Sequence, residues 1–381
     1  MLGLLVALQV GLATPVGSAA FKGATFDPLV TAGIAEGVFP GAVLVIGRRD
    51  SLLFERGYGH LTWAKTSPVP DPDSTLWDLA SLTKVLATTT AVMLLVDRGL
   101  VRLDAPVVTY VPAFGAPGTA AITVRELLTH TSGLKPTLPL FREPDSAAAL
   151  RRVHEATPVV PPGSRVVYSD LNGILLGEIV QHVSGEPLDR FVAREVCGPL
   201  ALDHTLFRPP AALRREIAPT GEWHGHPVAG VVNDQNAVRL GGVAGHAGLF
   251  STGADVARFA QFILRGGTTA DGHPLVRRAT LEEFTTAATP VAGTKTERRA
   301  LGWQAVPTGE TVSSAGTRFG PRSIGHTGWT GTSLWIDPDR DLFVVLLTNR
   351  AFAPRTRRPF TRLKEVRGKV ADAAAQASDG S

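Results

Sequence analysis

The runs of sequence that favour β-strands lie near the two ends of this chain, and the runs that favour helices lie between them. Early in the chain, residues 42–49 and 51–58 are β-prone and flank a turn around Asp50, which predicts a β-hairpin. Four further β-like runs come late, at residues 301–306, 323–328, 332–336 and 342–349. Strands at both ends of the chain indicate one antiparallel sheet that the two termini close together.

The middle of the chain has the pattern of helices. Six are predicted there, at residues 81–98, 124–130, 147–156, 171–184, 188–196 and 252–265. Thr123 with Glu126, and Thr252 with Asp255, have the spacing of helix N-terminal caps. A last helix is expected at residues 360–375.

These patterns predict an α+β fold. We expect an α/β sandwich whose antiparallel sheet is built from both termini, with an all-α domain inserted into it. We place the sheet domain at residues 21–75 and 290–381 and the mainly helical domain at residues 76–289. The cleft between these two units is the natural position for an active site.

Composition narrows the range of functions. With 381 residues, of which 44% are hydrophobic, the chain can bury a large core. The single cysteine, Cys197, has no partner for a disulfide, and His224 with His226 lack a third ligand at metal spacing, so we expect no metal and no cofactor. Of the 38 basic residues 31 are arginines, dispersed along the chain, which argues against a nucleic-acid partner.

The N-terminal segment decides where we expect the protein to act. Residues 1–20 are apolar and end in small residues, which resembles a signal peptide, although the usual preceding positive charge is missing. Cleavage there would make the protein exported or periplasmic, and otherwise we expect a cytoplasmic protein. No run of 18 apolar residues occurs in the body of the chain, so we expect no integral membrane span.

A reactive serine is indicated at the start of the apolar helix at residues 81–98. Ser81 and Lys84 form an S-x-x-K motif. Positions i and i+3 of a helix share a face, so the Lys84 amine lies beside the Ser81 hydroxyl and can help to remove its proton. The helix N-terminus adds N–H groups that stabilise an oxyanion.

A second S-x-x-K match, from Ser132 to Lys135, provides an internal control. It contains Gly133 and precedes Pro136, which predicts a loop in which the two side chains need not face each other. We therefore take Ser81, not Ser132, as the candidate nucleophile.

Three ordered elements carry a family resemblance. The motif Ser81–Lys84 is followed by Tyr168-Ser169-Asp170 and then by His326-Thr327-Gly328. This order resembles the serine β-lactamase and penicillin-binding-protein superfamily, whose elements are S-x-x-K, Y-x-N and K-T-G. Intervening segments also look like β-lactamase-related serine hydrolases of the class C or family VIII esterase type, at residues 127–134, 175–177, 241–252 and 346–349.

The resemblance implies a β-lactamase/transpeptidase-like fold and assigns roles to the motif residues. Ser81 would be the nucleophile and Lys84 its proton partner, while Tyr168 would relay the proton as acid or base. Either Lys84 or Tyr168 could be the general base. The backbone N–H groups of Ser81 and Trp329 would form the oxyanion hole, and Thr327 and Gly328 would contact substrate.

Two motif positions depart from the family pattern. Asp170 replaces the asparagine of Y-x-N, and His326 replaces the lysine of K-T-G. We assign His326 to the catalytic group as a neutral donor without a full charge, and Asp170 to substrate binding. A negative charge about 5 Å from an anionic substrate would repel it by roughly 3 kcal/mol at an effective dielectric of 20, which disfavours penicillins.

Two further histidines have candidate roles. His246, in a glycine-rich loop, is either a residue of the cleft rim that contacts substrate or a loop residue bonded to backbone. His130 is expected to cap the end of a helix.

We expect a serine hydrolase that acts through an acyl-enzyme on a small-molecule ester or amide. The leading expectation is a carboxylesterase for short-chain esters with weak or no β-lactamase activity. The alternatives are a peptidoglycan-related D,D-peptidase, D-aminopeptidase or amidase, and a class C-type β-lactamase. A non-catalytic penicillin-binding-like sensor is a further alternative, against which the intact Ser81, Lys84 and Tyr168 count.

Overall fold

The computed structural model describes residues 21–287, 298–307, 312–352 and 360–380. The predicted signal peptide at residues 1–20 lies outside these ranges. So does residue 381.

The main sheet joins the two ends of the chain, as predicted. Strand β1 (Gly41–Arg48) pairs antiparallel with β12 (Leu342–Thr348), so that Val45 lies opposite Val345. The sheet has seven strands among the described residues, in the order β2-β1-β12-β11-β10-β9-β8. The other five are β2 (Ser51–Gly59), β8 (Arg298–Arg299), β9 (Gln304–Ala305), β10 (Ile324–Thr327) and β11 (Ser333–Asp337).

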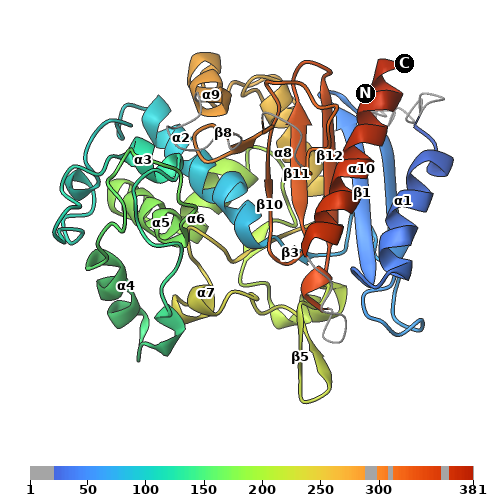
Figure 1. Ribbon diagram of the computed structural model, residues 1–381, viewed down its shortest axis with the longest axis horizontal. Helices are drawn as coiled ribbons and strands as arrows, with labels where there is room; N and C mark the ends of the chain where they lie inside the picture. The colour runs from blue at the N-terminus through green and yellow to red at the C-terminus, as the bar shows by residue number, and fades with distance from the viewer. Residues whose placement is uncertain (1–20, 288–297, 308–311, 353–359, 381) are drawn as a thin grey trace, which may run out of the picture.

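Both faces of the sheet are covered by helices, which explains why β1 is apolar on both sides. Helices α1 (Gly23–Ala35) and α10 (Phe360–Asp379) lie side by side on one face, where Leu44 and Ile46 join their core (Figure 1). Helix α8 (Gly253–Leu264) packs on the other face, against Val43 and Val45. Although α8 lies in the range that we predicted as helical domain, it forms a layer of the sandwich.

The predicted hairpin and final helix are both present, and one late strand is corrected. Instead of a strand at residues 301–306, the chain forms a tight β8–β9 hairpin, in which the Ala300 N–H donates to the Trp303 carbonyl. Gly302 has φ +84° in this turn, a conformation that other residues rarely adopt. The segment that we predicted as one strand therefore contains a reversal of the chain direction.

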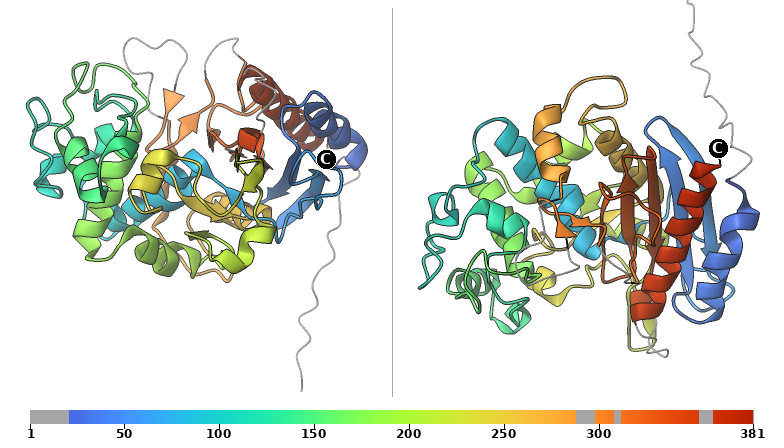
Figure 2. Two further views of the ribbon diagram at one scale, coloured as in Figure 1. Left: turned by 90° about the horizontal axis from the view of Figure 1, so that it is seen from below. Right: turned by 45° about the horizontal axis from the view of Figure 1, so that its top comes forward.

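The inserted region contains short strands, so the expectation of an all-α domain is wrong in that detail. Strand β7 (Leu249–Ser251) pairs with both β3 (Trp77–Asp78) and β4 (Leu206–Phe207), while β5 (Gly221–Trp223) pairs with β6 (His226–Val228). Figure 2 shows the helices grouped on one side of the sheet. They are α2 (Thr90–Asp97), α3 (Val124–Leu128), α4 (Ser146–His154), α5 (Asp170–Ser184), α6 (Leu188–Val192), α7 (Gln235–Arg239) and α9 (Arg278–Thr285).

The predicted helix at residues 81–98 is helical throughout but irregular at its start. A 3₁₀ turn (Ala80–Leu82) leads into a π-helical segment (Lys84–Thr89), which continues as α2. Segments of π-helix are rare and are often found at functional sites. By length and composition Ala80–Asp97 could cross a membrane, but 83% of it is buried inside the protein, as in a core helix.

One glycine in β10 allows the sheet to pack. A Cβ built on Gly325 would lie 2.4 Å from the ring of Trp335 in β11, and a Cβ on Gly221 would meet nothing within 4 Å. We expect Gly325→Ala to lower the free energy of unfolding by about 1–3 kcal/mol through overpacking, and Gly221→Ala to change it by less than about 0.5 kcal/mol. Urea unfolding of both variants measures this, and equal losses would contradict it.

Candidate active site

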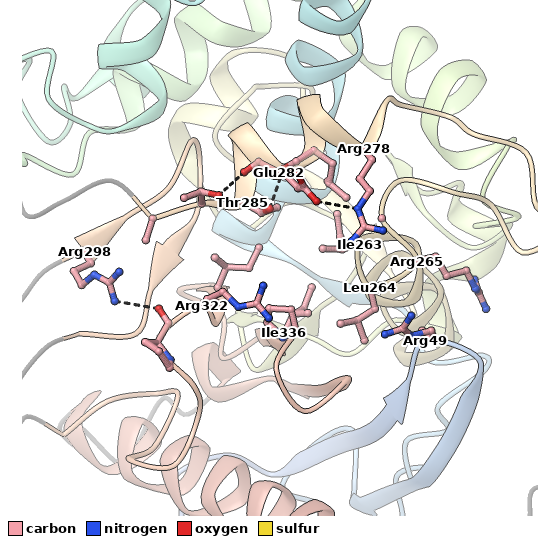
Figure 3. Close-up of a pocket in the computed structure, with 17 residues that line it drawn as sticks. Arg49, Ile263, Leu264, Arg265, Arg278, Glu282, Thr285, Arg298, Arg322 and Ile336 are labelled. Carbon is pink, nitrogen blue, oxygen red and sulfur yellow. Dashed lines mark hydrogen bonds and ion pairs between the residues drawn. The ribbon is translucent and has the colours of Figure 1, made fainter.

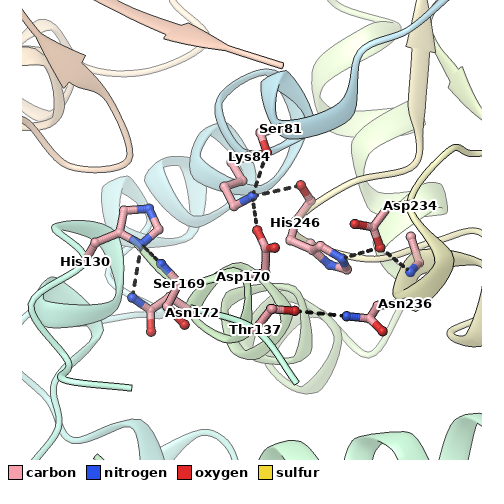
Figure 4. A network of polar contacts seen from close by, with 12 residues as sticks. Ser81, Lys84, His130, Thr137, Ser169, Asp170, Asn172, Asp234, Asn236 and His246 are labelled. Atoms are coloured by element: carbon pink, nitrogen blue, oxygen red, sulfur yellow. Dashed lines mark hydrogen bonds and ion pairs between the residues drawn. The ribbon is translucent and has the colours of Figure 1, made fainter. Parts of the chain in front are cut away.

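Lys84 brings together the first residues of the candidate active site. Its Nζ donates to Ser81 Oγ at 3.1 Å, to the Asp170 carboxylate at 2.8 Å and to the carbonyl oxygen of His246 at 3.1 Å (Figure 4). Lys84 is only 4% exposed. The three acceptors therefore replace water around a buried ammonium group.

The ion pair corrects our expectation about charge. Burial disfavours the Lys84 ammonium, but the Asp170 carboxylate and Tyr168 outweigh it and raise the pKa of Lys84 above its usual 10.5. Lys84 is thus charged in the resting site and does not have the lowered pKa that a neutral lysine base needs. The Asp170 carboxylate is paired with Lys84, so its negative charge is compensated, and the predicted repulsion of anionic substrates loses its main source.

Asp78 shapes the turn that precedes the nucleophile. Ala80 has φ +47°, a strained backbone conformation for a residue with a side chain. The buried Asp78 carboxylate accepts the N–H of Ala80 at 2.9 Å and the N–H of Asn233 at 2.7 Å. These two bonds hold the strained turn in front of Ser81.

The loop after β10 is tied to the same turn. Thr330 Oγ1 donates to the Asp78 carbonyl at 2.7 Å, and Thr332 Oγ1 donates to the Leu79 carbonyl at 2.9 Å. A Cβ on Gly328 would lie 2.5 Å from the Leu79 oxygen, so only glycine permits this close approach. The loop thus places the predicted oxyanion residue Trp329 next to the start of the Ser81 helix.

The two predicted oxyanion donors are available for a ligand. Within the described part of the chain, neither the Ser81 N–H nor the Trp329 N–H donates to a protein acceptor. The Trp329 side chain is 63% exposed and stacks on Phe360 of α10, with 5.9 Å between the ring centroids. The side chain therefore lies at the surface, while the backbone amide would serve the reaction.

Tyr168 lies between two histidine rings. Its ring centroid is 4.5 Å from that of His130 and 5.9 Å from that of His326, and Lys84 Nζ lies 4.9 Å from the same ring. The Tyr168 hydroxyl is buried and has no hydrogen-bond partner among the described residues. This oxygen is therefore open to a reacting group or to water.

The tautomer of His326 follows from its hydrogen bond and corrects its expected donor role. Nδ1 lies 2.9 Å from the Thr327 carbonyl, which can only accept, so Nδ1 carries the proton. Burial, followed by the charges of Arg299 and Lys84, lowers the pKa of His326 well below 6.5, so the ring is neutral. In that neutral ring Nε2 is an acceptor, and it has no partner in the described structure.

His130 is a positioning residue that the sequence reading missed. Its Nδ1 accepts from the Ser169 N–H at 3.1 Å and lies 3.2 Å from the Asn172 amide nitrogen, next to Tyr168. Burial, with Arg299 as the next cause, lowers the pKa of His130 well below 6.5. The ring with which we expected to cap a helix therefore supports Tyr168 as a neutral acceptor.

His246 contributes mainly through its backbone carbonyl and through a side-chain hydrogen bond. Its carbonyl accepts from Lys84, and its Nε2 donates to Asp234 at 3.1 Å. Burial opposes ionisation of Asp234, but this bond and the His246 charge lower the pKa of Asp234 to about 2. The ring is only 1% exposed, so the cleft-rim role stays a prediction and the structural contacts are what is observed.

The structure also locates the other residues that the sequence analysis singled out. Thr327 lines a cavity of about 440 Å³ together with Phe360 and Lys364 of α10. Ser132 is fully buried and donates to the Asn172 side chain at 2.7 Å, as expected of a serine that is not the nucleophile. Cys197 is buried, and no cluster of three metal-ligating side chains occurs among the described residues.

A larger cavity lies elsewhere and lacks the chemistry of a hydrolase. It has a volume of about 680 Å³, lies beside Ile324 at the start of β10, and has no serine, cysteine, histidine or lysine among its described lining residues (Figure 3). Four of its five arginines are paired with carboxylates, as Arg49–Asp341, Arg265–Asp50, Arg278–Glu282 and Arg322–Asp339. The site at Ser81 is therefore the stronger candidate for catalysis.

Comparison with known proteins shows what the chain is similar to. The β-lactamase family model matches residues 26–367. A protein of Escherichia coli (strain K12) named "Putative D-alanyl-D-alanine carboxypeptidase" is 33% identical over 353 residues, which cover 83% of this chain and 80% of that protein. A protein of Salmonella typhi with the same name is 30% identical over the same shares.

Solved structures share the fold at lower identity. A penicillin-binding-protein homologue from Caulobacter crescentus is 22% identical, with a TM-score of 0.71 and coverage of 93% of this chain and 98% of that one. A class C β-lactamase is 19% identical, with a TM-score of 0.75 and coverage of 94% and 98%. The hydrolase EstCE1, described as having promiscuous acyltransferase activity, is 21% identical, with a TM-score of 0.73 and coverage of 92% and 98%.

Asp78 should make stability depend on pH. Burial raises the pKa of Asp78 from its usual 3.8 to about 6, against the opposing hydrogen bonds from Asn233 and Ala80. The folded protein then retains a proton that the unfolded chain releases, so this contribution is complete below about pH 4 and is lost as the pH rises through 6. Relative to Asp78→Asn, the wild type should lose up to about 3 kcal/mol of unfolding free energy between pH 4 and pH 7. Urea unfolding at four pH values measures this, and parallel pH curves for the two proteins would refute it.

Proposed function

The chain belongs to the β-lactamase family and is a serine hydrolase of the β-lactamase and penicillin-binding-protein superfamily, and on this premise we propose that it hydrolyses short-chain carboxylic esters. The reaction proceeds through an acyl-enzyme on Ser81. The physiological substrate is a small molecule, and no cofactor takes part.

One observation carries the choice of ester over penicillin. The position that holds the lysine of K-T-G in the related families holds His326 here, and its Nε2 is an acceptor in a neutral ring. A lysine there offers three donors and a positive charge to a substrate carboxylate, whereas an acceptor lone pair repels one. Neutral esters do not meet this penalty.

The proton path follows from the charge on Lys84. Because Lys84 is already an ammonium group paired with Asp170, it cannot accept the Ser81 proton in the resting site. We therefore assign the proton acceptor to Tyr168 as phenolate, with Lys84 stabilising the negative charge. Lys84 also orients Ser81 through the 3.1 Å hydrogen bond.

The reaction then consists of two balanced halves. Ser81 Oγ bonds to the ester carbonyl carbon while its proton moves to the Tyr168 oxygen, and the N–H groups of Ser81 and Trp329 bind the oxyanion. When the tetrahedral intermediate collapses, the C–O bond to the alcohol breaks and Tyr168 returns the proton to the departing oxygen. Water repeats the sequence on the acyl-enzyme and releases the carboxylic acid.

A D-alanyl peptidase is the second candidate, and two observations favour it. The Escherichia coli relative carries a D-alanyl-D-alanine carboxypeptidase name and covers most of this chain. In addition, the Asp170 charge is compensated by Lys84, so Asp170 does not repel a C-terminal carboxylate as an isolated charge would. The two candidates share Ser81 and differ in what binds the substrate's acidic end.

Covalent labelling tests the nucleophile. A fluorophosphonate probe should add once to the wild type, and the adduct should map to Ser81, which combines a lysine neighbour with a backbone N–H that has no acceptor among the described residues. Ser132→Ala should label like the wild type, and Ser81→Ala should not label. Intact mass and peptide mapping give the result, and an adduct that persists in Ser81→Ala would rule the assignment out.

Substrate profiling tests the ester proposal. We expect measurable hydrolysis of C2 to C6 p-nitrophenyl esters and weak turnover of nitrocefin, because His326 lacks the charge that holds a carboxylate. In His326→Lys, the ratio of kcat/KM for nitrocefin to that for p-nitrophenyl butyrate should rise about tenfold or more. Faster wild-type turnover of nitrocefin or of D-alanyl-D-alanine peptides than of butyrate ester would favour the alternatives.

A further inference from the structure

A buried arginine from the edge of the sheet reaches the candidate catalytic tyrosine. Arg299 lies in β8 and is 5% exposed, and its Cζ is 5.2 Å from the ring centroid of Tyr168. Across the strands it lies opposite Gln304, which in turn lies opposite Gly325, the neighbour of His326. None of the sequence motifs includes this residue.

We infer that Arg299 is a positioning residue that supplies the fixed positive charge which His326 does not carry, and that it acts on Tyr168. The inference rests on the proposed function of Ser81. Where the related families place a lysine in the K-T-G strand, this chain places the corresponding charge two strands away and directs it at the tyrosine ring.

The charges around Tyr168 support this role. Two cations contact its ring, because Lys84 Nζ lies 4.9 Å from the centroid and Arg299 Cζ lies 5.2 Å from it. The other titratable groups that the described structure places against the ring are His130 and His326, both neutral, and Asp170 is paired with Lys84. Both cations attract negative charge on the Tyr168 oxygen.

Arg299 also acts on the two imidazoles. After burial, its charge is the largest cause that lowers the pKa of both His130 and His326. Keeping both rings neutral preserves their acceptor nitrogens and leaves Lys84 and Arg299 as the two charged donors at the ring. A guanidinium has only N–H donors and no acceptor, so Arg299 contributes charge and donors to the site.

Arg299 affects one step of the reaction, the transfer of the Ser81 proton to Tyr168. When the Ser81 proton moves to the Tyr168 oxygen, the tyrosine must first be present as phenolate, and Arg299 stabilises that form without contacting the substrate. Loss of the cation should therefore lower the rate and move the pH at which activity appears, whereas loss of a packing residue would lower the rate alone.

Three variants separate charge from packing. In Arg299→Gln we expect kcat/KM for p-nitrophenyl butyrate to fall about 10- to 100-fold and the midpoint of its rising pH limb to move up by about one pH unit. Arg299→Lys keeps the charge and should recover at least part of both effects. Arg322→Gln is the control, since Arg322 is exposed and is paired with Asp339 outside the candidate site; it should stay within about threefold of the wild type.

A relocated charge gives the sharper test. In the double variant Arg299→Gln with His326→Lys, a cation returns to the K-T-G position, so kcat/KM should rise about tenfold or more above that of Arg299→Gln. The His326→Lys change alone adds a third cation beside Tyr168 and should bring no comparable gain on the butyrate ester. Such non-additive effects would indicate that a cation at either position stabilises the same negative charge on Tyr168.

The outcomes are distinguishable from those of the proposed function. Fluorophosphonate labelling of Ser81 and the melting temperature are recorded for every variant. If the wild type neither labels at Ser81 nor hydrolyses esters, the proposed function fails. If it does both, but Arg299→Gln has an unshifted pH limb, or its loss is restored neither by lysine at position 299 nor by lysine at position 326, then Arg299 is structural and the inference is overturned.

Discussion

One ammonium group, buried in the middle of the molecule, sets the constraint that the candidate site satisfies. Lys84 can keep its charge only because a carboxylate, a backbone carbonyl and a hydroxyl surround it, and these come from α5, the loop of His246 and the turn before α2. Removing any one of them would leave a buried charge less well compensated. The hydrogen bond that orients Ser81 is therefore also one of the three that stabilise the buried charge of Lys84.

The rest of the site is organised by backbone contacts that cross between the helical region and the sheet. The threonines of the loop after β10 donate to the carbonyls of residues 78 and 79, and Arg367 of α10, which is buried, donates to the carbonyls of Gly328 and Thr332. The same loop is thus held from two sides, by the turn before Ser81 and by a helix on the far face of the sheet. Such double support is what a preorganised oxyanion site requires.

Sequence reasoning found the elements whose signal is local. The closure of the sheet by both ends, the Thr123–Glu126 capping box and the Ser81–Lys84 pair were all predicted, because strand pattern, cap spacing and helical periodicity are properties of short segments. The partners of those segments were not. These contacts depend on packing between segments that are distant in the sequence. They are the bond of Asp170 to Lys84, the contact of His130 with Tyr168 and the approach of Arg299 from β8. The aspartate at position 170 holds a usable signal for this ion pair, since a buried lysine needs a counter-charge.

The pairing of β1 with β12 has a consequence for how the protein is made. The two strands are joined by hydrogen bonds although about 300 residues separate them in the chain. During synthesis β1 and β2 emerge early and can form their hairpin, but the edge of β1 that belongs to β12 stays unpaired until almost the whole chain has left the ribosome. That edge carries Val43, Leu44, Val45 and Ile46, a segment of high β-propensity and no charge. The nascent chain must therefore carry an aggregation-prone strand for most of its translation.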